Sequence, residues 1–535
     1  MLKLSNLSMP PDYTDASLRA AVLKKCGLQE DQLLFLQVVR RSVDARDKSD
    51  VRFVLSVNLK VKNEALLLKK CRFLSPVPPV PALSLPAARF SAPPLVVGAG
   101  PAGLFAALTL ARAGAAPVLV ERGRPVEKRT GDVERMSAEG VLDPESNVQF
   151  GEGGAGAFSD GKLTCGVKSP LLRPVLDTFV AHGAPPEILT DALPHIGTDR
   201  LRGVVASIRE EIRSLGGTVL FETRLEELII RGSHVEGAVL SHAGERTEFR
   251  TDTVLLCIGH SARDTVQSLF TQGVRMAQKP FAMGVRVEHP RAFIDRAQYG
   301  AFAGHPALGA ASYKLVCHTP DSRGVYTFCM CPGGYVIAAA SAPGGVVVNG
   351  MSLHARDAEN SNSALLVGVQ TGDFGDDHPL AGMVLQRQIE KAAFRVGGGG
   401  FRAPAQRVED FLLGRETKAF GEVRPSYRPG VTPADLREVL PAFITENLKK
   451  GLRAMNTQLS GFAMPDAVLT APETRSSSPV RLLRDAGGES ESVAGLFPAG
   501  EGAGYAGGIV SAAMDGIQAA MRALNKTSLL KQDER

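Results

Sequence analysis

The strongest constraint on the fold is the run Gly98-Ala-Gly100-Pro-Ala-Gly103, which follows the apolar stretch Leu95–Val97 and opens a helical pattern over residues 104–114. The next apolar stretch ends at Glu121, 23 residues after Gly98. This combination of strand, glycine spacing, helix and acid is typical of a β-α-β unit that binds a dinucleotide. The glycines permit a tight turn and a close approach to a pyrophosphate at the helix N-terminus, and the acid accepts hydrogen bonds from ribose hydroxyls. Because a carboxylate repels a 2′-phosphate, the pattern predicts FAD or NAD rather than NADP, bound by Gly98, Gly100, Pro101, Ala102, Gly103, Glu121 and Arg122.

A second glycine-rich run near the C-terminus decides between these two cofactors. Residues 494–509 read AGLFPAGEGAGYAGGI, an apolar strand followed by a turn and the start of a helix near Gly508. Such a turn suits a flavin, since the helix N-terminus would face the N1/C2=O edge, where reduced flavin is anionic. The alternative is a helix of small residues that packs closely on a sheet. The flavin interpretation adds Gly500, Glu501, Gly507, Gly508 and Ile509 to the cofactor-binding residues.

Further motifs carry a resemblance to a known family. They are Phe150–Lys162 (FGEGGAGAFSDGK), Cys257–Asp264 (CIGHSARD), Cys331–Gly334 (CPGG), Glu473–Pro479 (ETRSSSP) and the run AGEGAGYAGGI. Together they resemble a family of FAD-dependent oxidoreductases, or FAD-dependent dehydrogenases, of poorly defined substrate. The resemblance covers residues from about 30 to about 520 and implies FAD and a fold similar to fumarate reductase-type flavoproteins. One departure is that the usual Gly-Asp flavin motif reads Gly500-Glu501 here, which lengthens the acid by one methylene.

The resemblance also implies site residues between the two glycine-rich ends. The loop after the first β-α-β unit would wrap the flavin with Gly153, Gly154, Ala155, Phe158, Ser159 and Lys162, and Leu225 and Gly259 would approach the cofactor. We take Lys162, His260, Arg263 and Cys331 as catalytic candidates, because a cation near N1/C2=O stabilises reduced flavin and His260 or Arg263 could meet a substrate anion. The alternatives are a solvated lysine, a structural histidine and a surface arginine.

Cys329 and Cys331 form the motif Cys-Met-Cys. In a regular strand, residues two apart share a face but lie too far apart for easy bridging, and exchange-active pairs favour Cys-x-x-Cys at a helix start. Three interpretations remain open: a redox dithiol, a thiol in the substrate pocket, or packing. No cluster of histidines or cysteines has zinc spacing, so we predict no metal.

The pattern of apolar runs and turns predicts an α/β protein that carries an inserted domain and a small N-terminal unit. Residues 32–42 and 51–62 read as antiparallel strands, with helices capped by Asp15 and Asn63, which gives a small β-α-β-β-α unit. A stretch over residues 75–94 holds seven prolines and reads as a linker. We predict a Rossmann-like FAD-binding domain with an inserted mixed α+β substrate domain and a small N-terminal α+β (ferredoxin-like) domain. The boundaries are 1–75 for the N-terminal domain, 76–94 for the linker, 95–274 and 441–525 for the FAD-binding domain, 275–440 for the insertion and 526–535 for a tail.

Composition narrows the function classes. The chain has 535 residues, of which 44% are hydrophobic, and this content excludes a disordered protein. Its net charge of +5 is too small for a chain of this length to create a strong field for nucleic acid. Seven cysteines and the absence of a signal-peptide pattern predict a cytoplasmic protein without a membrane span. Expected partners are a small-molecule substrate and a transient electron donor, either NAD(P)H or another reductant. Two alternatives remain: an RNA-modifying or RNA-associated flavoprotein that uses the basic N-terminal segment, and a noncatalytic flavin-binding interaction protein.

Overall fold

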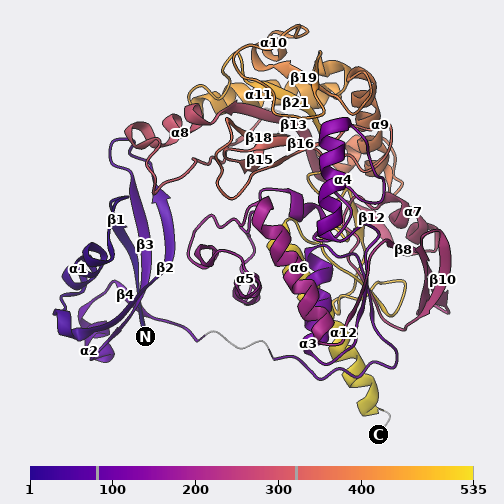
Figure 1. The fold of residues 1–535 in the computed structure, drawn as a ribbon, viewed down its shortest axis with the longest axis horizontal. Helices are drawn as coiled ribbons and strands as arrows, with labels where there is room; N and C mark the ends of the chain where they lie inside the picture. Colours follow the sequence, from indigo (N-terminus) through magenta and orange to yellow (C-terminus); the bar gives the residue numbers. More distant parts are fainter. Residues whose placement is uncertain (80–83, 320–322, 534–535) are drawn as a thin grey trace.

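The computed structural model describes residues 1–79, 84–319 and 323–533. Figure 1 shows a small N-terminal unit on the left, a large sheet at the top, and a group of helices below that sheet. Within the described ranges, no helix combines the length and apolar character needed to cross a membrane.

The parallel sheet holds the first glycine-rich turn. Its strand order is β23-β11-β5-β6-β7, and each neighbouring pair is parallel. Because helices and a second sheet cover its two faces, its strands are continuous apolar runs rather than alternating ones. The prediction that the C-terminal segment rejoins this sheet is confirmed, since β23 pairs with β11. The strands are β5 (Leu95–Val97), β6 (Val118–Val120), β7 (Thr218–Leu220), β11 (Val254–Leu256) and β23 (Leu496–Pro498).

The helices that share one apolar cluster with this sheet include α3 (Pro101–Arg112), α6 (Thr198–Ser214) and α12 (Ile509–Asp533). The two helices that begin at the glycine-rich turns, α3 and α12, pack so closely that a Cβ atom on Gly516 would lie 2.0 Å from the Ala102 carbonyl oxygen. A second apolar cluster joins the sheet to the antiparallel strands β8 (Thr223–Arg231), β9 (His234–His242) and β10 (Glu245–Arg250). The predicted tail at 526–535 begins inside α12, which runs to Asp533; residues 534–535 lie outside the described ranges.

The large mixed sheet has the order β14-β15-β18-β13-β21-β19-β20. The predicted end of the insertion, residue 440, is too early, because α11 (Ala442–Gln458) packs on this sheet and β21 (Val468–Glu473) pairs with β13 and β19. An amphipathic helix shows in sequence that one face is buried, but not which sheet buries it. The other strands are β13 (Phe281–Pro290), β14 (Val316–His318), β15 (Gly324–Cys331), β18 (Asn360–Val369), β19 (Ala403–Arg407) and β20 (Val431–Pro433).

Shorter elements connect these layers. The helices are α4 (Val126–Glu139), α5 (Leu172–Ala181), α7 (Arg263–Thr271), α8 (Arg291–Tyr299), α9 (Ala381–Val396) and α10 (Val408–Leu413). Two strand pairs, β12 (Met276–Gln278) with β22 (Val480–Leu482) and β16 (Tyr335–Ala338) with β17 (Val348–Met351), complete the connections.

The N-terminal unit is an antiparallel sheet of order β2-β3-β1-β4 with two helices. Its elements are β1 (Leu2–Met9), α1 (Asp15–Cys26), β2 (Leu33–Asp44), β3 (Arg52–Val61), α2 (Glu64–Lys70) and β4 (Leu74–Pro76). Asn63 caps α2 as predicted, accepting the Leu66 N–H at 3.1 Å. The predicted Asp15 cap is wrong: Thr14 accepts the Ser17 N–H at 3.2 Å, and Asp15 is the first helical residue.

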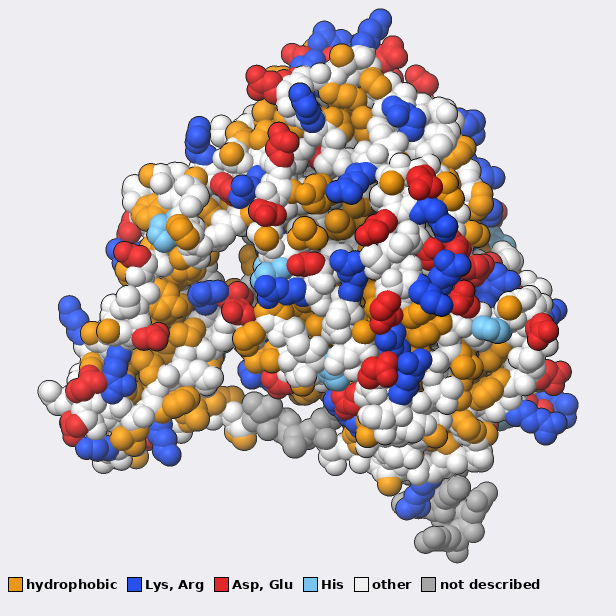
Figure 2. All heavy atoms as spheres, viewed as in Figure 1, with side chains coloured by type: hydrophobic (Ala, Val, Ile, Leu, Met, Phe, Trp, Pro, Cys, Tyr) orange, Lys and Arg blue, Asp and Glu red, His pale blue; other side chains and the backbone are white. Residues whose placement is uncertain are grey.

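Few polar contacts tie this unit to the rest of the chain. Arg41 pairs with Asp191 at 2.9 Å, and Lys48 donates to the Gln298 carbonyl on α8. On the face drawn in Figure 2, basic and acidic side chains are interspersed over the unit. Residues 80–83 of the predicted linker lie outside the described ranges.

Candidate functional site

A cavity runs along the carboxyl ends of the parallel strands. Gly98, Glu121, Cys257 and Ala499, which follow β5, β6, β11 and β23, all line it. This edge is where open α/β sheets bind ligands. The large mixed sheet and its β17 neighbour supply the opposite wall through Phe328, Cys329, Asn349 and Glu473. The site therefore lies between a backbone-rich turn and a wall of side chains.

The first glycine turn has the geometry that its spacing predicts. Gly98 has φ +99°, and a Cβ atom there would lie 2.5 Å from the Cys257 carbonyl oxygen. A Cβ atom on Gly103 would lie 1.7 Å from the Gly98 oxygen, so α3 packs on β5 only with glycine there. By contrast, the nearest atom to a Cβ on Gly100 is 3.8 Å away. Gly100 caps the N-terminus of α3 and lines the cavity, so its missing side chain leaves space for a ligand rather than for the protein.

Glu121 lines the cavity and is buried, but its carboxylate already holds the backbone of two turns. It accepts the N–H groups of Ala99 at 2.8 Å, Gly123 at 3.0 Å and Gly151 at 2.9 Å. Only one of these bonds reaches Oε2, which retains acceptor capacity for a ribose hydroxyl. Glu121 thus orders the turn as well as facing the cavity.

The neighbouring predicted residues at this end differ in role. Leu225 lines the cavity. Arg122 also lines it, but its guanidinium pairs with Glu145 and Asp264, each at 2.9 Å, and lies over the Phe150 ring. Although burial opposes it, these carboxylates raise the pKa of Arg122. The guanidinium is therefore already paired within the protein.

The loop after α4 contributes backbone to the cavity. Gly154, Ala155 and Ser159 line it, whereas Gly153, Phe158 and Lys162 do not. A residue that the sequence analysis missed, Arg129 on α4, fixes this loop: it is fully buried and donates to the carbonyls of Asn147, Val148, Gly151, Glu152 and Gly154. Burial lowers the pKa of Arg129 to about 10. Nothing in its helical sequence context distinguishes it from a surface arginine.

The C-terminal turn places Gly500, Glu501, Gly508 and Ile509 at the cavity, and leaves Gly507 outside the lining. Gly500 has φ +78° and donates its N–H to Asp515 on α12 at 2.7 Å, a contact that the sequence analysis also missed. Burial raises the pKa of Glu501 to about 7, against the opposing charge of Lys279.

His260 lines the cavity, whereas Arg263 lies outside its lining. Gly259 and His260 line the cavity, with His260 Nδ1 3.8 Å from Glu501. Burial and the charges of Arg475 and Arg263 lower the pKa of His260 to about 3, so its imidazole is neutral. Its Nε2 is buried without a hydrogen-bond partner among the described residues. Arg263 does not line the cavity but pairs with Glu390 at 2.8 Å, as does Arg475 at 3.0 Å.

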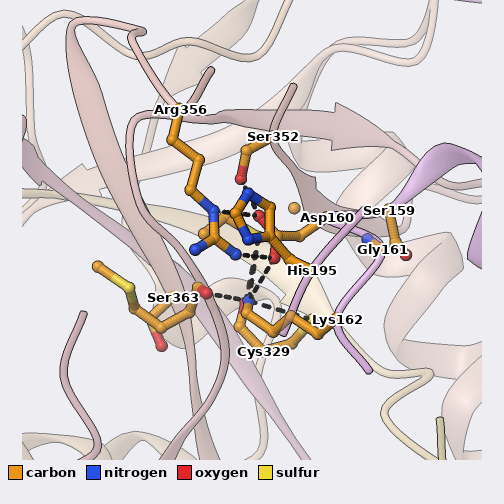
Figure 3. A network of polar contacts seen from close by, with 12 residues as sticks. Ser159, Asp160, Gly161, Lys162, His195, Cys329, Ser352, Arg356 and Ser363 are labelled. Atoms are coloured by element: carbon orange, nitrogen blue, oxygen red, sulfur yellow. Dashed lines mark hydrogen bonds and ion pairs between the residues drawn. The ribbon is translucent and has the colours of Figure 1, made fainter. Parts of the chain in front are cut away.

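Lys162 and Cys331 form a layer behind the wall. Lys162 Nζ donates to the Met330 carbonyl and lies 4.0 Å from Cys329 Sγ and 3.8 Å from Cys331 Sγ, with Asp160 at 3.5 Å (Figure 3). Glu473, which does line the cavity, accepts a hydrogen bond from Arg286 at 3.1 Å. Burial raises the pKa of Glu473 to about 7. Lys162, which the sequence analysis placed near the flavin, lies outside the cavity lining and contacts the two thiols.

Family models match three segments of the chain. The model described as "FAD-dependent protein, C-terminal domain-like" matches residues 280–476, an "FAD binding domain" matches residues 91–131, and a domain of unknown function matches residues 1–60. Together with the cavity, these matches define an FAD-binding α/β flavoprotein. A Clostridium beijerinckii protein, itself described as uncharacterized, is 45% identical over 535 residues, which cover 99% of this chain and 100% of that one. The chain belongs to the same family of FAD-dependent oxidoreductases.

The solved structures that match the chain are more distant in sequence. A flavoprotein/dehydrogenase from Cytophaga hutchinsonii is 11% identical with a TM-score of 0.37, covering 83% of this chain and 79% of its own. Aklavinone-11 hydroxylase, solved with FAD and aklavinone, is 15% identical with a TM-score of 0.32, covering 83% of this chain and 63% of its own.

FAD is the cofactor of this protein, and the cavity fits it. Gly100 leaves open space at the N-terminus of α3, where a pyrophosphate binds, and Glu121 faces the cavity near the predicted ribose. The unpaired His260 Nε2 is a polar group that the protein leaves for a ligand.

Proposed function

We propose that this enzyme transfers a hydride between a small organic substrate and an electron acceptor through non-covalently bound FAD. The observation that carries the proposal is the continuity of the cavity, which joins the dinucleotide turn at Gly98–Gly103 to a wall that bears Cys329 and Glu473. A site that only stored flavin would have no need of buried titratable groups facing it.

The two ends of the cavity suit different parts of FAD. Glu121, Arg122 and Leu225 would hold the adenosine end, and the N-terminus of α3 would hold the pyrophosphate. Glu501 and the N-terminal end of α12 would hold the ribityl chain and the ring edge. Bound FAD supplies a two-electron acceptor, and the remaining steps fall to the side chains of the wall.

Glu473 is the proton acceptor in this proposal. When an alcohol or amine is oxidised, its C–H bond gives up a hydride and its O–H or N–H bond gives up a proton. A general base that takes this proton works best when its pKa is near the working pH. The raised pKa of Glu473, about 7, meets that condition. His260, neutral with a pKa of about 3, offers a hydrogen bond to the cofactor or substrate but not a charge.

The first test is the cofactor itself. The full chain is denatured and the released flavin is chromatographed; we expect FAD, and recovery of FMN or of no flavin after reconstitution would contradict the proposal. Gly100→Val is expected to abolish FAD retention while preserving the fold, because its side chain enters the space that the ligand needs. Gly131→Ala on α4, where a Cβ meets no atom within 4 Å, is the matched control and should retain FAD.

The second test is turnover. Oxygen-free protein is mixed with NADH or NADPH and bleaching of the flavin is followed, and reoxidation is then screened against a panel of small-molecule acceptors. Flavin that no donor reduces and no acceptor reoxidises would favour a noncatalytic role.

A further inference from the structure

We propose that Cys329 and Cys331 form a dithiol that exchanges an electron pair with FAD, so that the enzyme holds a second two-electron centre beside its flavin. The inference rests on the FAD site proposed above. It adds a redox role to two thiols that hydride transfer does not require.

A β-bulge brings the two cysteines together. Three steps along β15, from Phe328 to Cys331, span only two steps along β18, and Cys329 has φ +43°, in the left-handed region that non-glycine residues rarely adopt. Residues two apart in a regular strand have Cα atoms about 6.7 Å apart, at the far end of the range of about 4.4–6.8 Å found in disulfides. The bulge shortens this stretch of strand, so the regular-strand argument against a bridge does not apply here.

The pair is also placed for one thiol to meet the flavin and the other to stay behind it. Cys329 is half-buried and lines the cavity, whereas Cys331 is fully buried and donates to the Cys329 carbonyl at 3.3 Å. All seven cysteines of the chain are described, and all carry free thiols. The reduced pair is thus the state that this structure shows.

Two cations favour a thiolate at this place. Lys162 Nζ lies 4.0 Å from Cys329 Sγ, and Arg286 donates to the Cys329 carbonyl at 2.9 Å while its Nη2 lies 3.6 Å from Cys331 Sγ. Asp160 and Glu473 are the acidic groups of the cluster. The hydrogen bond from Cys331, followed by the charges of Lys162 and Arg286, lowers the pKa of Cys329, whereas burial raises that of Cys331. One thiolate beside one thiol is the pairing that starts disulfide chemistry.

The exchange balances with FAD alone. The Cys329 thiolate and the Cys331 thiol form an S–S bond as the S–H bond of Cys331 breaks; two electrons and that proton pass to oxidised FAD, which becomes the singly anionic reduced flavin. In the reverse direction, reduced flavin returns the electron pair and the proton, and the two cysteines regain their thiolate and thiol. Lys162 is a positioning residue here, because it acts on the thiolate and not on the flavin.

The test counts electrons. Oxidised FAD-loaded protein is titrated with dithionite in the absence of oxygen while flavin absorbance is followed. We expect about two molecules of dithionite per FAD for the native chain and about one for Cys331→Ser, since each two-electron centre consumes one. Cys317→Ser on β14, a half-buried thiol outside the cavity lining, is the matched control and should titrate like the native chain.

A second measurement needs no variant. Native protein is oxidised, denatured with an alkylating agent present, digested and weighed by mass spectrometry. We expect the peptide with Cys329 and Cys331 to be unalkylated and two hydrogens lighter than its dithiol form, and doubly alkylated after reduction through the flavin. Full FAD reduction by one dithionite per FAD, or both cysteines alkylated in the oxidised protein, would overturn the dithiol and leave the flavin proposal intact. Absence of bound FAD would instead overturn the proposed function.

Discussion

The two sides of the cavity are built in different ways. The turn side presents backbone: Gly98, Gly100 and Gly500 lie at the carboxyl ends of parallel strands, and Gly100 leaves room for a cofactor. The wall side presents side chains from the mixed sheet, among them Cys329 and Glu473. The difference suggests that the turn side recognises a dinucleotide shared by many flavoproteins, while the wall side sets the chemistry of this one.

Each side of the cavity carries a buried carboxyl group. Burial raises the pKa of both Glu501, on the turn side, and Glu473, on the wall side, to about 7. The two carboxyls have similar pKa values but different positions. Replacing each by an amide should therefore affect a different property, FAD binding for Glu501 and the rate of flavin reduction for Glu473.

The largest effect is expected for Gly103→Val. A Cβ atom there overlaps the Gly98 carbonyl oxygen, so α3 cannot pack on β5 and the turn side is lost as a unit. We expect no FAD retention and a protein that is insoluble or lacks a cooperative melting transition, measured by flavin absorbance and circular dichroism. A folded, FAD-loaded variant would show that the turn side tolerates displacement. Gly131→Ala is again the control.

Glu390→Gln should destabilise the folded protein, because Glu390 pairs with both Arg263 and Arg475 between the two sides of the cavity. Although burial raises it, the charges of Arg475 and Arg263 lower the pKa of Glu390 to about 2. This folded-state pKa lies below the unfolded value of about 4.3, so the Glu390 carboxylate contributes on the order of 3 kcal/mol to the free energy of unfolding. The contribution is present above about pH 4.3 and is lost as the pH falls toward 2. Urea unfolding should show a deficit of about 3 kcal/mol for the variant at neutral pH, shrinking below about pH 4.

The control for this measurement is Glu446→Gln, whose side chain is 59% exposed in its pair with Lys449. We expect it to change the free energy of unfolding by less than about 1 kcal/mol. Equal effects of the two substitutions would show that the buried pairs of Glu390 stabilise the fold no more than the exposed pair of Glu446 does.

Glu473→Gln should change the rate and its pH dependence. With Glu473 as proton acceptor, the native rate of flavin reduction by substrate rises as pH increases through about 7, the pKa of its carboxyl. The variant should bind FAD, lose about 100-fold in that rate and lose the rise near neutral pH. Stopped-flow reduction at a series of pH values measures both. An unchanged pH profile would assign the proton to another group.

The smallest effect is expected for Glu501→Gln. Its place on the turn side predicts weaker FAD binding, by about 1.5 kcal/mol from the altered hydrogen bond, with the pH dependence of reduction retained. Equilibrium dialysis of FAD measures the first and stopped-flow reduction the second. A lost pH dependence with normal FAD affinity would reverse the roles of the two carboxyls.

The sequence predicted the turn side well and the wall side poorly. Gly98, Gly100, Glu121 and the C-terminal turn follow from local spacing, because a tight turn between a strand and a helix involves residues that are neighbours in the chain. The sequence analysis did not predict Arg129 and Asp515, because their buried hydrogen bonds join separate segments and no local sequence pattern marks such contacts. The same holds for Arg263, whose partner Glu390 lies on a helix of the inserted segment.

Local sequence is enough to specify the dinucleotide turn, the apolar strands around it and the Asn63 cap that begins α2, because each depends on steric and hydrogen-bonding preferences over a few residues. Which groups gather at the wall follows from tertiary packing. Lys162, Cys329 and Glu473 come from three segments, and a one-residue bulge in β15 alters the spacing of the thiols. Strand pairing and the bulge depend on contacts between distant residues, and the burial that shifts their pKa values exists only after the two sheets have packed.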